Sequence, residues 1–389
     1  MASPQEGAFS TEDMLAAAKA AVCSAARVAA VVSRGGGVGA LSKTDSSPVT
    51  VADYAAQGAV TLTLLLALHG PSATRALLSG ASGVPPSFRL LAEEDAGELA
   101  VGGEGLLRAV AAALGGAAHA KGAFWPDAVA PSWEPGDVLR VLSAAGACEG
   151  GGAAERAGGG APGYWVLDPI DGTKGYLRGG QFAVGLAFVR DGAPQLCAIA
   201  CPALPFPAWR APGGGGAVGT LFSAAAGGGA FMEPLLGAAS GGPGPTRIRV
   251  DALAPRGLTL CESFDPAHSN HAASARVAAA VGTALGTAAW ADTIQVDSMC
   301  KYGLLARGCA HVYMRIPRKG YAEKVWDHAP GDLLLREAGG VVADGEGRRL
   351  DFSQGRTLKG NNGVIVGACS ERVHAAVLAA LAASGGGGE

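Results

Sequence analysis

The chain has 389 residues, of which 49% are hydrophobic and 16% charged, and its formal net charge is −3. This length suffices for one large domain or two of ordinary size, with a sizeable core. No run of Lys and Arg is present, which argues against a nucleic-acid-binding surface. An acidic balance does not exclude phosphate substrates, because divalent cations offset the repulsion between carboxylates and phosphate.

The eight cysteines form no C-x-x-C pair, so the sequence does not indicate a zinc knuckle or a thioredoxin-like site. Without a secretory signal, free thiols are the simpler interpretation. The apolar run Val60–Leu68 covers about half of a membrane span. The acidic N-terminus is unlike a transit peptide. We therefore expect a cytoplasmic monomer that does not enter a membrane, although an organelle and other oligomeric states stay open.

The first half of the chain predicts helices packed on an antiparallel sheet. The expected helices cover residues 11–33 and 51–68, and the expected strands cover 88–91, 164–167, 182–189, 195–200, 218–225 and 229–232. Residues 115–163 are rich in Gly, Ala and Pro without a clear period, which indicates a surface insertion.

The turn-rich segment 238–245 is the candidate boundary between two subdomains, 1–245 and 246–389. Beyond it, strands and helices alternate, as in an α/β domain. The expected strands are 258–262, 293–296, 311–316, 341–342 and 364–366, and the expected helices are 272–285, 298–307, 328–338 and 371–383.

The segment DPIDGTK at residues 168–174 carries the strongest chemical signal. It follows an apolar strand, and its two carboxylates, Asp168 and Asp171, stand across a short Pro-Ile turn. Gly172 permits close approach to a ligand, and Thr173 lies where a helix can begin. Two solvated aspartates in a turn are the alternative interpretation.

Three further acidic residues also stand at the ends of predicted elements. Glu93 follows a strand, Asp327 precedes a helix and Asp53 begins one. An exposed acidic loop and two helix caps would explain them individually. Together with Asp168 and Asp171, they suit a hard cation with oxygen ligands, and the scarcity of nearby histidine disfavours zinc.

Two motifs resemble the signatures of the inositol monophosphatase superfamily, a group of magnesium-dependent, lithium-sensitive phosphatases. They are DPIDGT at 168–173 and WDHAPG at 326–331. The stretches at 47–54, 171–181, 298–308 and 315–326 are similar to the 3′(2′),5′-bisphosphate nucleotidase branch. The likeness extends from about residue 11 to 383, apart from 115–163. Pro330 and Ala92 depart from the usual Ala and Gly of the motifs.

The resemblance implies a layered α/β/α/β/α sandwich of the sugar-phosphatase type with the site between two subdomains. It implies hydrolysis of 3′-phosphoadenosine 5′-phosphate to AMP and phosphate, which clears a by-product of sulfate transfer. Some members act on the 5′-phosphosulfate analogue or on inositol phosphates, and the sequence does not decide among these substrates.

The resemblance also implies two or three Mg²⁺ ions and a catalytic water that they make more acidic. The ion ligands would be Glu93, Asp168, the Ile170 carbonyl, Asp171 and Asp327. Asp53 and Thr173 would orient or deprotonate the water.

The implied substrate contacts, besides Thr173 and Asp327, are His268, Ser298, Lys301, Arg315 and Arg356. Each has a plainer alternative: a loop histidine, a capping serine, a surface lysine and surface arginines. Two rival functions remain. One is an inositol phosphate phosphatase of the same superfamily, and the other is a non-catalytic sensor of metal or nucleotide.

Overall fold

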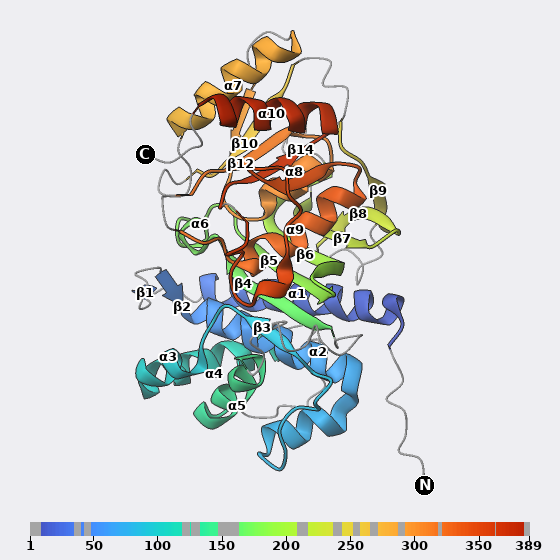
Figure 1. Ribbon diagram of the computed structural model, residues 1–389. Helices are drawn as coiled ribbons and strands as arrows, with labels where there is room; N and C mark the ends of the chain where they lie inside the picture. The colour runs from blue at the N-terminus through green and yellow to red at the C-terminus, as the bar shows by residue number, and fades with distance from the viewer. Residues whose placement is uncertain are drawn as a thin grey trace.

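The computed structural model describes residues 9–34, 40–42, 48–118, 125, 133–146, 163–207, 217–235, 243–251, 257–264, 271–286, 292–317, 321–361 and 363–384. Within this part of the chain, a seven-stranded and a five-stranded sheet alternate with three layers of helices (Figure 1). The α/β/α/β/α arrangement expected from the sequence is confirmed.

Two long helices form the outer layer beneath the seven-stranded sheet. Helix α1 spans Thr11–Arg34, and α2 spans Val51–Leu78 after the short paired strands β1 (Ala40–Ser42) and β2 (Pro48–Thr50). Many alanines on α1 are buried, which lets the two helices pack closely. The predicted end of α2 at Leu68 lies next to a kink at Gly70, whose φ is 78°. The helix resumes at Pro71, because proline is tolerated in a first helical turn.

Both α1 and α2 are long and apolar enough to cross a membrane by length and composition alone, contrary to the expectation drawn from Val60–Leu68. Most of the apolar window in each helix is buried inside the protein. Core helices of globular proteins satisfy the same test, because they are apolar on several faces.

The seven-stranded sheet has the order β3-β4-β5-β6-β7-β8-β9, and all neighbours are antiparallel except β3 and β4. Its strands are β3 Leu90–Ala92, β4 Tyr164–Asp171, β5 Ala183–Arg190, β6 Ala193–Phe206, β7 Ala217–Ala225, β8 Gly229–Pro234 and β9 Thr246–Ile248. The predicted β5–β6 hairpin turns through Asp191 and Gly192, both with positive φ. Strand β9 carries this sheet past residue 245, and residues 238–242 of the expected boundary lie outside the described part.

Helices α4 (Glu104–Ala118) and α5 (Pro135–Gly146) pack beside α2, and the short helix α3 (Ala96–Val101) packs against α4 and α5. Helix α5 falls within the expected insertion 115–163, and the sequence analysis did not predict it. Its Val138, Val141 and Leu142 belong to the same core cluster as α2. Residues 119–124, 126–132 and 147–162 of that segment lie outside the described part.

The five-stranded sheet has the order β11-β10-β12-β14-β13, and its strands mix parallel and antiparallel pairs. They are β10 Thr259–Glu262, β11 Asp292–Gln295, β12 Val312–Arg315, β13 Val341–Asp344 and β14 Ile365–Ala368. Helices α7 (His271–Leu285) and α10 (Glu371–Ala383) cover its outer face, whereas α8 (Cys300–Ala306) and α9 (Val325–Glu337) fill the layer between the sheets (Figure 1). The predicted α/β alternation is confirmed.

Candidate active site

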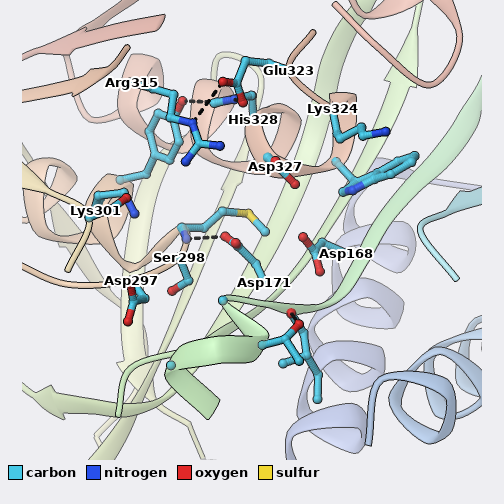
Figure 2. Close-up of a pocket in the computed structure, with 18 of the residues that line it drawn as sticks. Asp168, Asp171, Asp297, Ser298, Lys301, Arg315, Glu323, Lys324, Asp327 and His328 are labelled. Carbon is cyan, nitrogen blue, oxygen red and sulfur yellow. Dashed lines mark hydrogen bonds and ion pairs between the residues drawn. The ribbon is translucent and has the colours of Figure 1, made fainter. Parts of the chain in front are cut away.

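A cavity of about 430 Å³ lies where the two sheets and the central helices meet. Its lining includes Asp168 and Asp171 from β4, Lys301 from α8, Arg315 from β12 and Asp327 from α9. Figure 2 shows the carboxylates of Asp168, Asp171 and Asp327 directed towards one region of this cavity. Glu93, Ile170, Thr173 and Ser298 also line it. The structure therefore brings together most of the residues expected from the sequence.

An irregularity at the end of β4 places both aspartates on the cavity. Asp168 pairs with Gly185 of β5 and Asp171 pairs with Ala183, so three steps along β4 match two along β5. In a regular strand, residues three apart point to opposite faces of the sheet. The extra residue resets this alternation, as a β-bulge does. The strand was predicted to end at Leu167, and the bulged continuation is what lets Asp168 and Asp171 face one space.

Gly172 permits the chain to turn directly after β4. Its φ is 84°, and a Cβ atom there would lie 3.1 Å from the Cβ atom of Ser298. Both a left-handed backbone and close packing against the second subdomain favour glycine at this position. The short helix α6 (Thr173–Leu177) follows, as the sequence analysis expected.

Asp53 is buried at the start of α2 and connects that helix to Thr173. Its Oδ2 accepts hydrogen bonds from the Thr50 amide at 2.8 Å and the Thr50 hydroxyl at 2.7 Å, which completes a capping box. Its Oδ1 lies 3.2 Å from the Thr173 hydroxyl, which is also 3.3 Å from the Ile170 carbonyl oxygen. Asp53 is thus not the N-cap, which is Thr50, but the N3 residue of the capping box and the partner of a hydroxyl that lines the cavity.

Asp171 and Asp327 are held in a setting that disfavours their charged forms. Burial raises the pKa of Asp171 to about 6, and the nearby Glu93 carboxylate adds to the rise, although Lys301 and the amide of Met299 oppose it. Burial, with repulsion from Asp171 and Glu93, raises the pKa of Asp327 well above its ordinary range. A bound cation would relieve this repulsion. Asp327 lies in the first turn of α9 after the N-cap Lys324, so it is not the cap.

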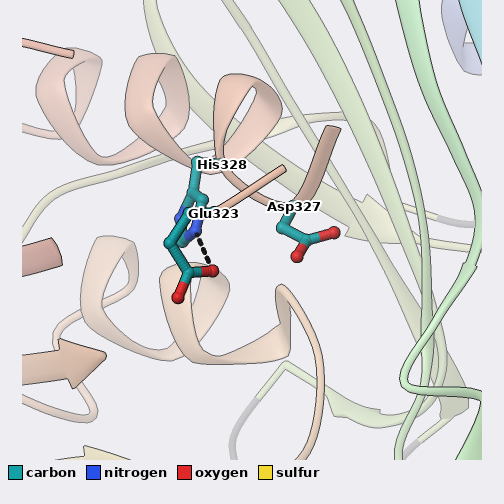
Figure 3. A group of neighbouring side chains, drawn as sticks. All are labelled: Glu323, Asp327 and His328. Atoms are coloured by element: carbon teal, nitrogen blue, oxygen red, sulfur yellow. Dashed lines mark hydrogen bonds and ion pairs between the residues drawn. The ribbon is translucent and has the colours of Figure 1, made fainter. Parts of the chain in front are cut away.

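Glu323, Asp327 and His328 offer ligand atoms within 4.8 Å of one another (Figure 3). Both ring nitrogens of His328 already have partners: Nδ1 lies 2.8 Å from the Tyr302 hydroxyl, and Nε2 lies 3.2 Å from a Glu323 carboxylate oxygen. The Asp327 carboxylate points away from this pair in Figure 3. Among the described residues, Glu323, Asp327 and His328 are the acidic group that could bind a metal, and Asp327 also lines the same cavity as Asp168 and Asp171.

The opposite side of the cavity is basic. Burial lowers the pKa of Lys301, while attraction to Asp171 opposes that change. Its Nζ is 3.4 Å from the Val296 carbonyl oxygen and lies over the Tyr313 ring. Arg315 donates a hydrogen bond from Nε to Oε1 of Glu323 at 3.0 Å. Attraction to Glu323, Tyr313 and Asp327 outweighs the effect of burial and raises the pKa of Arg315, so the guanidinium stays charged.

Of the expected substrate contacts that the structure describes, Arg356 is not among the residues that line the cavity. Arg356 stacks on Trp326 at 4.6 Å and donates a hydrogen bond from Nη2 to the Glu93 carbonyl oxygen at 3.0 Å. His268 lies outside the described residues. The sequence analysis in turn missed Lys324, Asp297 and Tyr321, which line the cavity. Asp297 stands next to the quoted stretch 298–308, and Tyr321 and Lys324 lie within the quoted stretch 315–326, so proximity to the motifs was the available signal.

Comparisons with known proteins agree with this geometry. The sequence profile described as "Inositol monophosphatase family" matches residues 145–385. A "3′(2′),5′-bisphosphate nucleotidase" of Oryza sativa is 37% identical over 357 residues, covering 90% of this chain and 89% of that protein. A "3′,5′-bisphosphate nucleotidase 2" of Arabidopsis thaliana is 34% identical and covers 92% and 93%.

Among solved structures, the crystal structure of CysQ from Bacteroides thetaiotaomicron is similar in fold. It is described as a bacterial member of the inositol monophosphatase family. The TM-score is 0.51 at 20% sequence identity, with 93% of this chain and 99% of that chain covered.

Proposed function

The chain belongs to the inositol monophosphatase family, and from that premise we propose that it is a magnesium-dependent 3′(2′),5′-bisphosphate nucleotidase. The proposed reaction removes the 3′-phosphate of 3′-phosphoadenosine 5′-phosphate and yields AMP and inorganic phosphate. One observation carries the proposal: a single cavity is lined both by the carboxylates of Asp168, Asp171 and Asp327 and by the cationic side chains of Lys301 and Arg315. Such a combination of charges suits a phosphate ester held between cations.

The donor atoms on the acidic side fit a hard divalent cation. They are carboxylate oxygens of Glu93, Asp168, Asp171 and Asp327, together with the backbone carbonyl of Ile170. Burial is the main cause of the raised pKa values of Asp171 and Asp327, and the positive charges nearby, Lys301 and Arg315 at Asp171 and Arg315 at Asp327, offset it only in part. Magnesium bound there would polarise the phosphate ester and acidify water at the site. Two or three ions are part of the proposal.

The Thr173 hydroxyl and Asp53 form the proton-handling pair. Since Asp53 Oδ2 is engaged by Thr50, its Oδ1 is the atom placed to receive a proton from Thr173. We expect Thr173 to orient the attacking water and to direct its proton towards Asp53. The oxygen of water bonds to phosphorus, the bond from phosphorus to the 3′-oxygen breaks, and that oxygen takes up a proton from a solvent water, while Asp53 later returns its proton to solvent.

The basic side would bind the phosphate groups of the substrate. Lys301 and Ser298 flank the start of α8, and Arg315 offers a forked guanidinium at the end of β12. The 5′-phosphosulfate analogue carries the same 3′-phosphate, so it is a second candidate substrate. Its hydrolysis would link the activity to sulfur metabolism. The cytoplasmic location of the protein and its monomeric state stay predictions.

The test is release of inorganic phosphate by the purified chain from 3′-phosphoadenosine 5′-phosphate, in Mg²⁺, in excess chelator, and in Mg²⁺ with added Li⁺. Inositol 1-phosphate is assayed in parallel. The proposal expects Mg²⁺-dependent, Li⁺-inhibited release with the nucleotide preferred. A preference for inositol 1-phosphate would overturn the substrate assignment, and no release from either substrate in Mg²⁺ would instead favour a non-catalytic sensor.

A further inference from the structure

The carboxylate of Glu323 is buried behind Arg315, on the side away from Asp171 (Figure 2). The residue is 1% exposed. One of its oxygens accepts a hydrogen bond from Arg315 Nε at 3.0 Å, and the other lies 3.2 Å from His328 Nε2. Glu323 and Arg315 both line the cavity, and the Arg315 guanidinium points towards its centre (Figure 2).

The position of Glu323 is fixed from the protein interior. His328 is 1% exposed, and its Nδ1 is 2.8 Å from the hydroxyl of Tyr302, which is equally buried. Tyr302 packs edge-on against Tyr313 at 5.1 Å. A buried chain of hydrogen bonds therefore leads from Tyr302 through His328 and Glu323 to Arg315. Such a fully partnered network restricts each member to one orientation.

Arg315 has competing anions in the same cavity. It interacts electrostatically with Asp171 and with Asp327, both of which the proposed function assigns to the cation. An arginine without a fixed partner would move towards these carboxylates, because a bidentate contact with a carboxylate is its preferred geometry. The guanidinium would then neutralise the carboxylates and would no longer be placed to bind a substrate phosphate.

We propose that Glu323 is a positioning residue that holds Arg315 directed at a substrate phosphate and keeps it away from Asp171 and Asp327. Tyr302 and His328 are the buried support of this residue. The inference rests on the proposed function for the identity of the substrate, but the phosphate-binding role of Arg315 can be measured without turnover. Nothing in the Glu323 assignment requires Glu323 to contact substrate or metal.

The experiment compares wild type, Glu323→Gln, Arg315→Met and the double variant. Glutamine keeps the shape of the side chain and removes its charge. We expect Glu323→Gln to raise KM for 3′-phosphoadenosine 5′-phosphate about tenfold, the loss typical of one charge-assisted hydrogen bond, with kcat within about threefold of wild type. In the Arg315→Met background, the same change should alter KM by less than about twofold, because Glu323 acts through Arg315.

Binding of inorganic phosphate and of AMP, measured by calorimetry, should show the same weakening and the same loss of additivity. This readout separates two failures. A chain that does not hydrolyse the nucleotide but still shows the phosphate-binding pattern contradicts the proposed function alone. Fully additive effects of Glu323→Gln and Arg315→Met, in KM and in phosphate binding, overturn the positioning role.

Asp332→Asn is the matched control, because Asp332 lies on α9, is buried, and binds Arg336 through two nitrogens at 3.0 and 2.6 Å. It should lower the melting temperature and leave KM unchanged. If Glu323→Gln does not fold, Tyr302→Phe tests the same chain by removing one hydroxyl, and a two- to threefold rise in KM is expected. Unchanged KM and unchanged phosphate binding in Tyr302→Phe would then count against the proposal.

Discussion

The acidic and the basic sides of the cavity differ in how their charges are balanced. On the acidic side, burial and mutual repulsion raise the pKa values of Asp171 and Asp327. On the basic side, Arg315 already has a buried anionic partner in Glu323, whose pKa is lowered because Arg315 and His328 outweigh the effect of burial. One side therefore needs a cation to complete it, whereas the other is held ready for an anion.

The difference also follows the architecture. Most residues of the acidic side come from the seven-stranded sheet and the segments next to it. The irregularity of β4 in this sheet brings Asp168 and Asp171 together. The basic side belongs to the five-stranded sheet and the central helices, where the end of β12 and the start of α8 supply Arg315 and Lys301. Asp327 is the member of the acidic cluster that comes from the second subdomain. Changes on the acidic side should therefore mainly reduce turnover, and changes on the basic side should mainly reduce affinity.

The largest effect is expected for Asp168→Asn. The residue is 2% exposed and lines the acidic side. Removing its charge should lower kcat by about a thousandfold, because cation-based charge stabilisation contributes several kcal/mol. The melting temperature should stay close to wild type. Asp95→Asn is the control, since Asp95 is an exposed cap of α3 and asparagine also caps helices. Near wild-type turnover by Asp168→Asn would refute the assignment of the acidic side.

Thr173→Val should lower kcat by about a hundredfold, within the usual range for general acid–base groups. Valine has nearly the same shape but lacks the hydroxyl that faces Asp53 Oδ1 at 3.2 Å. The Mg²⁺ concentration that gives half-maximal activity should be nearly unchanged, because the Thr173 side chain is not among the proposed ligands. Steady-state kinetics over a Mg²⁺ series measures both quantities. A variant that loses activity only through weaker Mg²⁺ binding would contradict the proton-handling role.

Lys301→Ala should raise KM about tenfold and change kcat less, because a charge-assisted contact to the substrate phosphate is lost. Lys301 is buried at the start of α8, so the melting temperature is measured alongside the kinetics. A lower kcat with unchanged KM would contradict the substrate-binding role of Lys301 and indicate a role in turnover instead.

Without Mg²⁺, stability should fall as the pH rises. The folded-state pKa of Asp171 is about 6, above its ordinary value of 3.8, so the native state holds a proton that the unfolded chain releases. The contribution of protonated Asp171 to the free energy of unfolding is complete below about pH 4. It is lost as the pH rises through about 6. Added Mg²⁺ should raise the melting temperature by roughly 3 °C or more at pH 7.5 and by less at pH 5. Thermal melts at both pH values, with chelator or Mg²⁺, give the comparison, and an equal shift at both would contradict it.

The smallest effect is expected for Arg356→Met. Its Nη2 donates to the Glu93 carbonyl oxygen, so it connects the second subdomain to a proposed cation ligand. We expect the Mg²⁺ concentration for half-maximal activity to rise about threefold, with KM for the nucleotide nearly unchanged, as for the loss of one hydrogen bond. A rise in KM at saturating Mg²⁺ would contradict this prediction and support the substrate contact that the resemblance implied for Arg356.

Strong local patterns predicted most of the elements. The helices 11–33 and 371–383 and the strand before Asp191 appear close to their expected limits, whereas the strand after it, expected to end at residue 200, continues to Phe206. Helix α5 was missed because its Ala- and Gly-rich surroundings obscure the period of Val138, Val141 and Leu142. Strand β9 was missed because three residues are too short to show alternation, and pairing with β8 decides its place.

The sequence by itself determined which chemical groups are available. The carboxylates of 168–171, the glycine that must follow them, and the Thr50–Asp53 cap all depend on residues within a few positions of one another. Only the tertiary structure decided their partners, because those contacts join distant parts of the chain. Thr173 meets Asp53 across 120 residues, and Arg356 meets Glu93 across 263. No local sequence pattern predicts contacts between residues so far apart in the chain. The packing of the two sheets therefore decides which side chains act together in the site.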